Sequence, residues 1–451
     1  MLIVPLLLAL PGSALALDDT PPEPAADEAP LEVGFLHATL ENGLTVSILS
    51  DPRMPIVATQ HWVRIGSVHE ADDQRGFAHL FEHMMFSATE ALPRGEYAKF
   101  HTRVGGSRNA YTTRDNTTYL SAVAPEHHDR VLEMEAERLH ALVIDPEEMA
   151  RDRKIVTEEL RMRTENSPVS RLLVDVELSL LGDHPYARSP VGTKEDIAAS
   201  TVEHARAFYE AYYRPEHIHL VIAGPVGGEA TLERVRELYG GLTAGSAERP
   251  PVTPLTELTW PASVELTEDI PPVRGVALSY PLPPTNHPDH FALQLMLSML
   301  SSDATDHFRE TLVTRRKKAL EAMTVTRRYR SGGALLFGSA SLPLRRQRRA
   351  FALAEQTVDE LGELEWNTPA ALDAARRATV RGEHFGVYSA EGMARRIGYA
   401  EWYLGDVQLA FDSAARLDAV TTEDIARVWG AFIADADPTR IYVHRGPGGA
   451  E

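Results

Sequence analysis

Apolar residues in the first half of the chain follow two spacings, one typical of strands and one typical of helices. Alternating or continuous runs of β-branched and aromatic residues predict strands, and apolar residues three or four positions apart predict helices. The expected strands are a hairpin at 40–48, with its turn at Asn42-Gly43, and strands at 56–65, 109–124 and 218–224. The expected helices cover 76–87, 95–104, 127–141, 145–162 and 193–213.

The second half repeats this order of elements after a proline-rich segment at 246–258. A strand is expected at 273–280, a strongly apolar helix at 289–300, and a closing strand at 439–443. Between them, helical spacing predicts helices at 345–364, 369–381, 390–404 and 422–434. The pattern predicts an α+β fold of two similar domains, 33–245 and 259–451, joined by a linker at 246–258. Each domain is expected to pack a mixed or antiparallel sheet against helices.

Length and composition limit the possible function. A chain of 451 residues exceeds what one hydrophobic core usually organises, which agrees with two domains. The net charge of −20 argues against a nucleic-acid partner. The chain has no cysteine, so thiol catalysis is excluded and any metal site must use histidine and carboxylate ligands.

The N-terminus has the pattern of an export signal. Its first 17 residues carry no charge and contain a short apolar run, followed by the small-residue cleavage pattern Ala14-Leu15-Ala16. We expect a signal peptide at 1–16 and a disordered, acid- and proline-rich leader at 17–32, hence a periplasmic or secreted protein. The apolar run is too short to span a bilayer, and we expect no stable membrane insertion.

One stretch carries a candidate chemistry. His79, Glu82 and His83 form H-x-x-E-H within the predicted helix 76–87, and positions i, i+3 and i+4 share one helix face. Two imidazoles there suit Zn²⁺, and the carboxylate is placed to act as a base on water at the metal. The alternative is an amphipathic helix whose apolar residues form core and whose polar residues are merely solvated.

A catalytic zinc needs a third protein ligand, and a family resemblance indicates which one. The chain resembles the pitrilysin (insulinase) family of zinc metallopeptidases, which includes the mitochondrial processing peptidases. The family has a glutamate about 76 positions after H-x-x-E-H, in a helix matched here by residues 152–159 (DRKIVTEE). This match implies Glu159 as the third ligand. The rival, Glu158, would point about 100° away around the helix.

The resemblance covers nearly the whole mature chain and implies roles for further residues. Segments 64–70, 105–112, 115–119 and 213–215 are similar to family signatures. Asn109 and Ala110 would lie on the edge strand that pairs with an extended peptide substrate, whereas the alternative for Asn109 is a turn.

Asp152 departs from the family pattern, which has a glutamate seven residues before the ligand glutamate. We expect Asp152 either to contribute to catalysis by orienting a group of the site or to be a surface acid paired with Arg151 or Arg153.

A second departure concerns the arginine–tyrosine pair that relatives carry in their non-metal half. The matching segment here, 312–323, has no tyrosine, and its Arg315 and Arg316 suit a solvated basic helix end. Relatives build a chamber from two halves of about this length. The resemblance therefore implies one half-clam of a heterodimer, with a related subunit supplying the Arg–Tyr pair; a homodimer is the alternative.

The implied function is a zinc endopeptidase that cleaves peptides or small unfolded proteins in an enclosed chamber. His79, His83 and Glu159 would hold Zn²⁺, and Glu82 would act as general base. Two alternatives keep the same fold: a non-catalytic scaffold subunit, and a subunit that binds peptides in a metal-dependent way without turnover.

Overall fold

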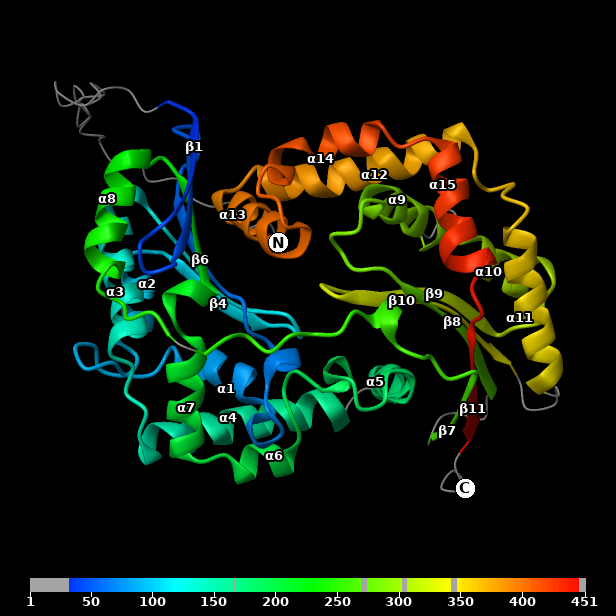
Figure 1. Cartoon of the computed structure of the whole chain (residues 1–451), viewed down its shortest axis with the longest axis horizontal. Coiled ribbons are helices and arrows are strands. Elements are labelled where there is room, and N and C mark those ends of the chain that lie inside the picture. The colour runs from blue at the N-terminus through cyan, green and yellow to red at the C-terminus, as the bar shows by residue number, and fades with distance from the viewer. Residues whose placement is uncertain are drawn as a thin grey trace, which may run out of the picture.

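Two β-sheets lie at opposite ends of the molecule, each accompanied by its own group of helices (Figure 1). The computed structural model describes residues 32–165, 168–245, 247–268, 274–301, 306–341 and 347–445. The predicted signal peptide (1–16) and all but the last residue of the predicted leader (17–32) lie outside these ranges. None of the described helices is long and apolar enough to cross a membrane.

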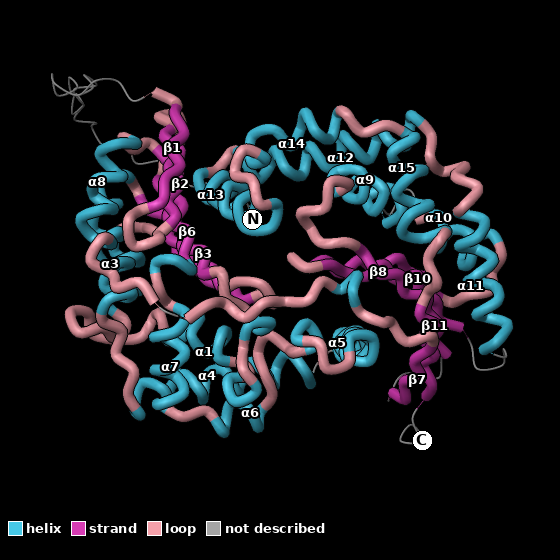
Figure 2. The backbone as a smooth tube through the Cα atoms, in the orientation of Figure 1, coloured by secondary structure: helices cyan, strands magenta, loops and turns pink. Residues whose placement is uncertain are grey.

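The first sheet has six strands, all from residues before the predicted linker. Figure 2 shows the strands in magenta, with those of the first sheet apart from those of the second. The order of the first sheet is β1-β2-β6-β3-β5-β4, and every pair is antiparallel except β2 with β6. β4 therefore lies at one edge. The strands are β1 (Gly34–Thr39), β2 (Thr45–Ser50), β3 (Val57–Val63), β4 (Ser107–Thr112), β5 (Thr117–Val123) and β6 (Ile218–Gly224).

The second sheet has five strands in the order β7-β11-β8-β10-β9, with only β7 and β11 parallel. This repeats the order and directions of β2-β6-β3-β5-β4 in the first sheet, so β9 is the counterpart of the edge strand β4. The strands are β7 (Ser263–Glu268), β8 (Arg274–Leu282), β9 (Glu321–Tyr329), β10 (Gly332–Ser341) and β11 (Thr439–Arg445).

Among the described residues, seven helices in each half occur at matching places between these strands, and α8 is additional. The first half contains α1 (Phe77–Met84), α2 (Glu96–Arg103), α3 (His128–His140), α4 (Pro146–Glu165), α5 (Pro168–Leu181), α6 (Lys194–Ala199), α7 (Val202–Tyr212) and α8 (Gly228–Tyr239). The second contains α9 (His290–Ser301), α10 (His307–Arg309), α11 (Gln347–Leu361), α12 (Pro369–Val387), α13 (Ala390–Tyr399), α14 (Leu409–Asp418) and α15 (Thr422–Trp429).

Each half lends a helix to the other. α13 packs on β3 and β6 of the first sheet, where Ile397 lies in one buried cluster with Trp62 and Val221. Its counterpart α5 packs on the second sheet, where Val176 lies in a cluster with Ile441. Both faces of the central strands are thus covered, which explains why β3, β5 and β6 are buried at every position.

The structure corrects three predicted elements. The single strand expected at 109–124 is the hairpin β4–β5, because the Thr113 hydroxyl accepts the backbone N–H groups of Asp115 and Asn116 and closes a turn. The single helix expected at 193–213 is α6 and α7, because Thr201 caps a new helix by accepting the N–H of His204. The hairpin at 40–48 starts earlier, with its first strand before Leu40.

Buried neutral histidines give the fold an acid-sensitive core. Burial lowers the pKa of His61 and His128 to about 4, from the ordinary value of about 6.5. Between these values the unfolded chain binds more protons than the folded chain. Their stabilising contribution is therefore complete above pH 6.5 and is lost as the pH falls through 4.

We predict that the metal-free chain loses about 2 kcal/mol of unfolding free energy per buried histidine between pH 7.5 and pH 5. Urea unfolding in the presence of a chelator measures this. His128→Gln should flatten the pH dependence, because it removes a group that titrates in this range. The amide can still bond the Thr59 hydroxyl, which lies 3.1 Å from the His128 Nε2 atom, so the fold should be kept. His127→Gln, at the half-buried neighbour, is the control, and an equal flattening there would contradict the assignment.

Candidate metal centre

The helix that carries H-x-x-E-H begins where two glycine backbones meet. Gly76 precedes α1 with a φ of +82°, and a Cβ there would lie 3.2 Å from Cα of Gly192 and 2.9 Å from the Ile197 side chain. Gly192 has a φ of +68°. Only residues without a side chain fit this crossing, so the two glycines fix where α1 starts.

Glu70 holds the first turn of α1. Its two carboxyl oxygens accept the backbone N–H groups of Gly76 at 2.9 Å and Ala78 at 2.8 Å, donors that a helix N-terminus otherwise leaves unsatisfied. Burial raises the pKa of Glu70 to about 8, while the two N–H donors and Arg188 act in the opposite direction. Both protonation states leave an acceptor on each oxygen, so the cap persists across neutral pH.

The apolar face of α1 packs against α7. Leu80, Phe81, Met84 and Met85 are all buried, and the Phe81 ring lies within 6.0 Å of three rings from α7 and its end, those of Phe208, Tyr209 and Tyr213. The apolar positions of the motif helix are core, as the amphipathic pattern predicts. Packing on this face turns the motif residues toward α4.

α4 supplies the facing carboxylate. Asp145 caps it by accepting the N–H groups of Glu147 and Glu148 at 2.9 Å, and Pro146 occupies its first position, as the sequence predicts. α4 packs directly on α1. The two helices thereby bring together residues that are 76 positions apart (159 − 83).

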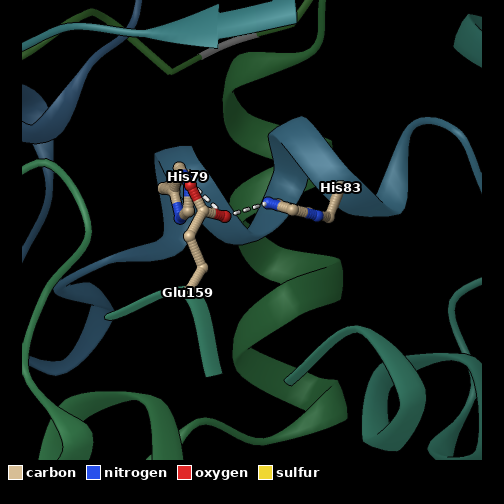
Figure 3. A group of neighbouring side chains, drawn as sticks. All are labelled: His79, His83 and Glu159. Carbon is tan, nitrogen blue, oxygen red and sulfur yellow. Dashed lines mark ion pairs between the residues drawn. The ribbon is translucent and has the colours of Figure 1, made fainter. Parts of the chain in front are cut away.

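His79, His83 and Glu159 form a group whose ligand atoms all lie within 4.8 Å of one another. Figure 3 shows the Glu159 carboxylate reaching from α4 toward both imidazoles of α1. Its Oε2 atom lies 3.2 Å from Nε2 of His83 and 3.7 Å from Nε2 of His79. Ligand atoms about 2.0–2.1 Å from a tetrahedral ion are roughly 3.3 Å apart, so the spacing fits zinc.

The structure separates Glu159 from its rival. The Glu158 side chain is 59% exposed and pairs with Arg161 at 3.2 Å on the solvent side of α4. The Glu159 side chain is 23% exposed and faces the histidines. Helix periodicity alone accounts for the difference.

Glu82 lies beside the ligand group and is held from the sheet. The Thr112 hydroxyl, at the end of β4, donates to Oε2 of Glu82 at 2.6 Å, and the same oxygen lies 3.9 Å from Nε2 of His79. The edge strand and the motif are therefore in direct contact. Asn109 and Ala110 both lie within β4, so the turn alternative for Asn109 is wrong.

Asp152 is buried, with 1% of its surface exposed, and is bound to the segment after α1. It accepts the Ser87 hydroxyl at 2.6 Å and forms an ion pair with Arg94. Arg151 pairs instead with Glu147 and Glu148, and Arg153 donates to a backbone carbonyl. The surface-acid alternative for Asp152 is wrong, because helix periodicity turns this residue inward with Glu159.

The segment expected to lack the Arg–Tyr pair, 312–323, follows α10 and runs into the start of β9. Arg315 is exposed and pairs with Glu310 at 3.1 Å, and Arg316 pairs with Glu360. Both arginines therefore have acidic partners within their own domain. Arg315 fits the solvated helix end that the sequence predicts, whereas Arg316 is partly buried.

Sequence reasoning missed the residues that hold the site from outside. Glu70 and Thr112 belong to the signature segments 64–70 and 105–112, but no spacing links them to α1. Arg94 lies in the segment between α1 and α2 and carries no signal of its own. Their roles depend on contacts between residues that are 6 to 58 positions apart in the sequence, which only the folded chain shows.

Comparisons with known proteins identify the family of the chain. Residues 45–193 match the family described as Insulinase (Peptidase family M16), and residues 200–379 match the Peptidase M16 inactive domain. Zinc protease PqqE of Helicobacter pylori is 26% identical over 412 residues, which is 90% of this chain and 91% of that protein. The expected family is confirmed.

Solved structures confirm the fold of two similar α+β domains. A protease from Helicobacter pylori superposes with a TM-score of 0.80 at 24% identity, covering 91% of this chain and 99% of that one. The periplasmic protease PqqL from Escherichia coli gives a TM-score of 0.69 at 20% identity, covering 92% of this chain but 48% of that chain. At these identities the likeness concerns the fold alone.

We predict that the chain binds about one zinc ion and that Glu159→Gln weakens zinc affinity more than about 100-fold, since losing a ligand should exceed the loss of an outer-shell partner. Competition with a zinc-binding dye measures the affinity. Glu158→Gln removes the same charge one position away and should change affinity less than about twofold. Equal effects of the two changes would exclude Glu159 as a ligand.

Proposed function

This chain belongs to the insulinase family of peptidases, family M16, and from that premise we propose that it is a zinc-dependent endopeptidase. The observation that carries the proposal is the convergence of His79 and His83 from α1 with Glu159 from α4, while Glu82 lies beside them in a separate bond with Thr112. Three ligands and a carboxylate that is not itself a ligand are the components that metal-assisted peptide hydrolysis requires.

We assign His79, His83 and Glu159 as the residues that hold Zn²⁺. When bound, zinc would polarise the scissile carbonyl and make water at the site more acidic. Glu82 takes a proton from the attacking water on its carboxylate and returns it to the leaving amine. The Thr112 hydroxyl keeps Oε2 of Glu82 in place, so the proton-accepting group does not have to reorganise during the reaction.

The substrate is proposed to bind as an added strand. β4 is the edge of the first sheet. Asn109 and Ala110 lie on it, three and two positions before Thr112, the residue that contacts Glu82. An extended peptide hydrogen-bonded to this edge would pass the base and the metal ligands. Main-chain pairing tolerates many side chains, which suits a peptidase for peptides and small unfolded proteins.

Asp152 is proposed as a positioning residue. It contacts Ser87 and Arg94, so it links α4 to the segment that follows α1. Glu159 lies two helical turns further along α4 on the same side, and the link fixes how its carboxylate meets the histidines. Asp152 therefore acts through Glu159 without touching the substrate.

A second subunit is proposed to complete the active enzyme. The chain covers about half of the periplasmic protease PqqL, and its segment 312–323 has no tyrosine for the family's Arg–Tyr pair. Large apolar side chains are exposed on neighbouring helices: Ile155 and Met162 on α4, and Val174 and Leu178 on α5. These four residues suit a subunit contact. We propose a heterodimer whose related partner supplies the pair; a homodimer is the alternative.

Export to the periplasm, or secretion, is proposed from the N-terminal signal pattern, and PqqL is itself a periplasmic protease. The alternatives of a scaffold and of a peptide-binding subunit without turnover are less well supported. Neither has any use for a carboxylate that the edge strand holds beside the metal ligands.

We predict that Glu82→Gln lowers kcat for peptide hydrolysis by about 10²–10⁴-fold and leaves zinc binding within about twofold, because it removes the base but no ligand. Cleavage of a mixture of short unstructured peptides, followed by mass spectrometry, measures the loss. Glu90→Gln, at an exposed glutamate soon after the motif, is the matched control. Unchanged turnover in Glu82→Gln would refute the mechanism.

We also predict that the zinc-loaded chain alone turns over slowly and that a co-expressed M16 subunit carrying the Arg–Tyr pair raises kcat at least about tenfold. Light scattering of the mixture should show a one-to-one complex. Ile155→Asp combined with Met162→Asp should abolish the complex while zinc binding persists. Full activity of the single chain would instead support a homodimer or monomer.

A further inference from the structure

The edge strand β4 presents alternate residues to two different helices. Ala110 and Thr112 face α1, since Ala110 packs on the core that includes α1 and Thr112 bonds Glu82. Ser107 and Tyr111 face α13: the Ser107 hydroxyl donates to Glu391 at 2.9 Å, and the Tyr111 ring meets Trp62, against which α13 packs. A peptide added to β4 would likewise direct alternate side chains toward α1 and toward α13.

A pocket of about 460 Å³ lies beside α13 in the second half. Its described lining comes mainly from α9, β9, α13 and α14, and contains the arginines Arg328, Arg395 and Arg396. α9 and β9 are the counterparts of α1 and β4, the elements that carry the two histidines and Thr112 in the first half. None of its described lining residues is acidic.

Two of the three arginines in this pocket lack an acidic partner among the described residues. Neither Arg328 nor Arg395 forms an ion pair with an acidic residue in the described part of the chain. Arg328 is largely buried, its Nη2 atom lies 3.4 Å from Nδ1 of His290, and its buried Nε has no hydrogen-bond partner among the described residues. Arg396 donates to the Ser413 hydroxyl. A largely buried guanidinium group such as that of Arg328 is unfavourable without an anion, and a bound anion would relieve this.

The neighbouring groups keep the pocket cationic. Burial, together with the charge of Arg328, lowers the pKa of His290 to about 4. This histidine is therefore uncharged at neutral pH. The charge of Arg395 also lowers the pKa of Tyr111 on β4, although burial raises it overall. Arg395 also lies about one helical turn after Glu391, whose carboxylate accepts the Ser107 hydroxyl of β4 at 2.9 Å. Glu391, at the start of α13, is bonded to Ser107 and does not line the pocket.

We infer that this arginine pocket binds a carboxylate of the substrate, so that the peptidase prefers peptides with an acidic group near the scissile bond. The inference rests on the proposed function, because it assumes a peptide on β4. Guanidinium groups recognise carboxylates by paired, charge-assisted hydrogen bonds. The pocket stands out against a net charge of −20 for the whole chain, which otherwise repels acidic peptides.

Binding can be measured apart from turnover with zinc-loaded Glu82→Gln protein, purified with any subunit that accompanies it. Dye-labelled ten-residue peptides, amidated at the C-terminus, would differ only in Glu or Gln at successive positions. Fluorescence anisotropy should show the best Glu peptide binding about tenfold more tightly than its Gln match. A neutral peptide with a free C-terminus, beside its amide, distinguishes a terminal carboxylate from a side-chain carboxylate.

Exposed Arg395 allows a substitution that spares the core. Arg395→Gln should reduce the preference to less than about threefold, and Arg395→Glu should favour a Lys peptide over the Glu peptide. Arg377→Gln, at an exposed arginine of α12 outside the pocket, should change nothing. The Gln peptide should bind all variants alike.

Equal binding of Glu and Gln peptides with no effect of a free C-terminus would overturn the inference. A preference that survives Arg395→Gln and Arg395→Glu, or the binding of no peptide at all, would overturn it too. The proposed function is judged separately, by cleavage of the same peptides with unsubstituted protein. Cleavage that depends on Glu82 but shows no preference for acidic peptides would support the proposed peptidase function and reject only the proposed role of the pocket.

Discussion

The buried contact between Asp152 and Arg94 is the constraint on which the candidate site depends. Two imidazoles on α1 make a metal site only if a third ligand reaches them from another helix. Whether a carboxylate of α4 does so depends on how α4 is rotated about its own axis. Asp152 is 1% exposed, so its negative charge requires a partner inside the protein. Arg94 provides it while also pairing with Glu148, one turn earlier on α4. Losing such a partner typically costs about 3–5 kcal/mol, which makes other rotations of α4 unfavourable.

The exchange of helices between the halves gives this site a rigid base. α13 covers the first sheet and α5 covers the second, so each half completes the other's core. Polar contacts reinforce the junction at the turn between β4 and β5, where Asp115 accepts the backbone N–H of Arg330 and Asn116 accepts the Tyr403 hydroxyl. This turn directly follows Thr112, the residue that bonds Glu82. The second half therefore supports the position of Glu82 through one strand.

The sequence was informative wherever the signal is local. The H-x-x-E-H spacing predicts a shared helix face, and helix periodicity correctly separates Glu159 from Glu158. It was uninformative about partners distant in sequence: Arg94 and Asp152 are 58 positions apart, and nothing in either segment points to the other. The break at Thr113, which turns one expected strand into the hairpin β4–β5, is a side-chain hydrogen bond among residues that also suit strands. The reciprocal covering by α5 and α13 depends on how two cores fit together, which no single window of sequence encodes.

The two halves share one architecture, yet matching elements carry different chemistry. In the first half, α1 carries two histidines that meet a carboxylate of α4. In the second, α9 buries Leu293, Met296 and Leu297, and the pocket beside it is lined by Arg328 of β9 and by two arginines of α13. Polar chemistry at the same place in a repeated fold needs little change to the core, because the strands and helix axes already fix where side chains converge. Because α13 carries part of the arginine lining and also bonds the edge strand through Glu391 and Ser107, the exchange of helices links the second half to β4. The proposed division, with one site that reacts with the peptide and one that selects it, would follow from this exchange.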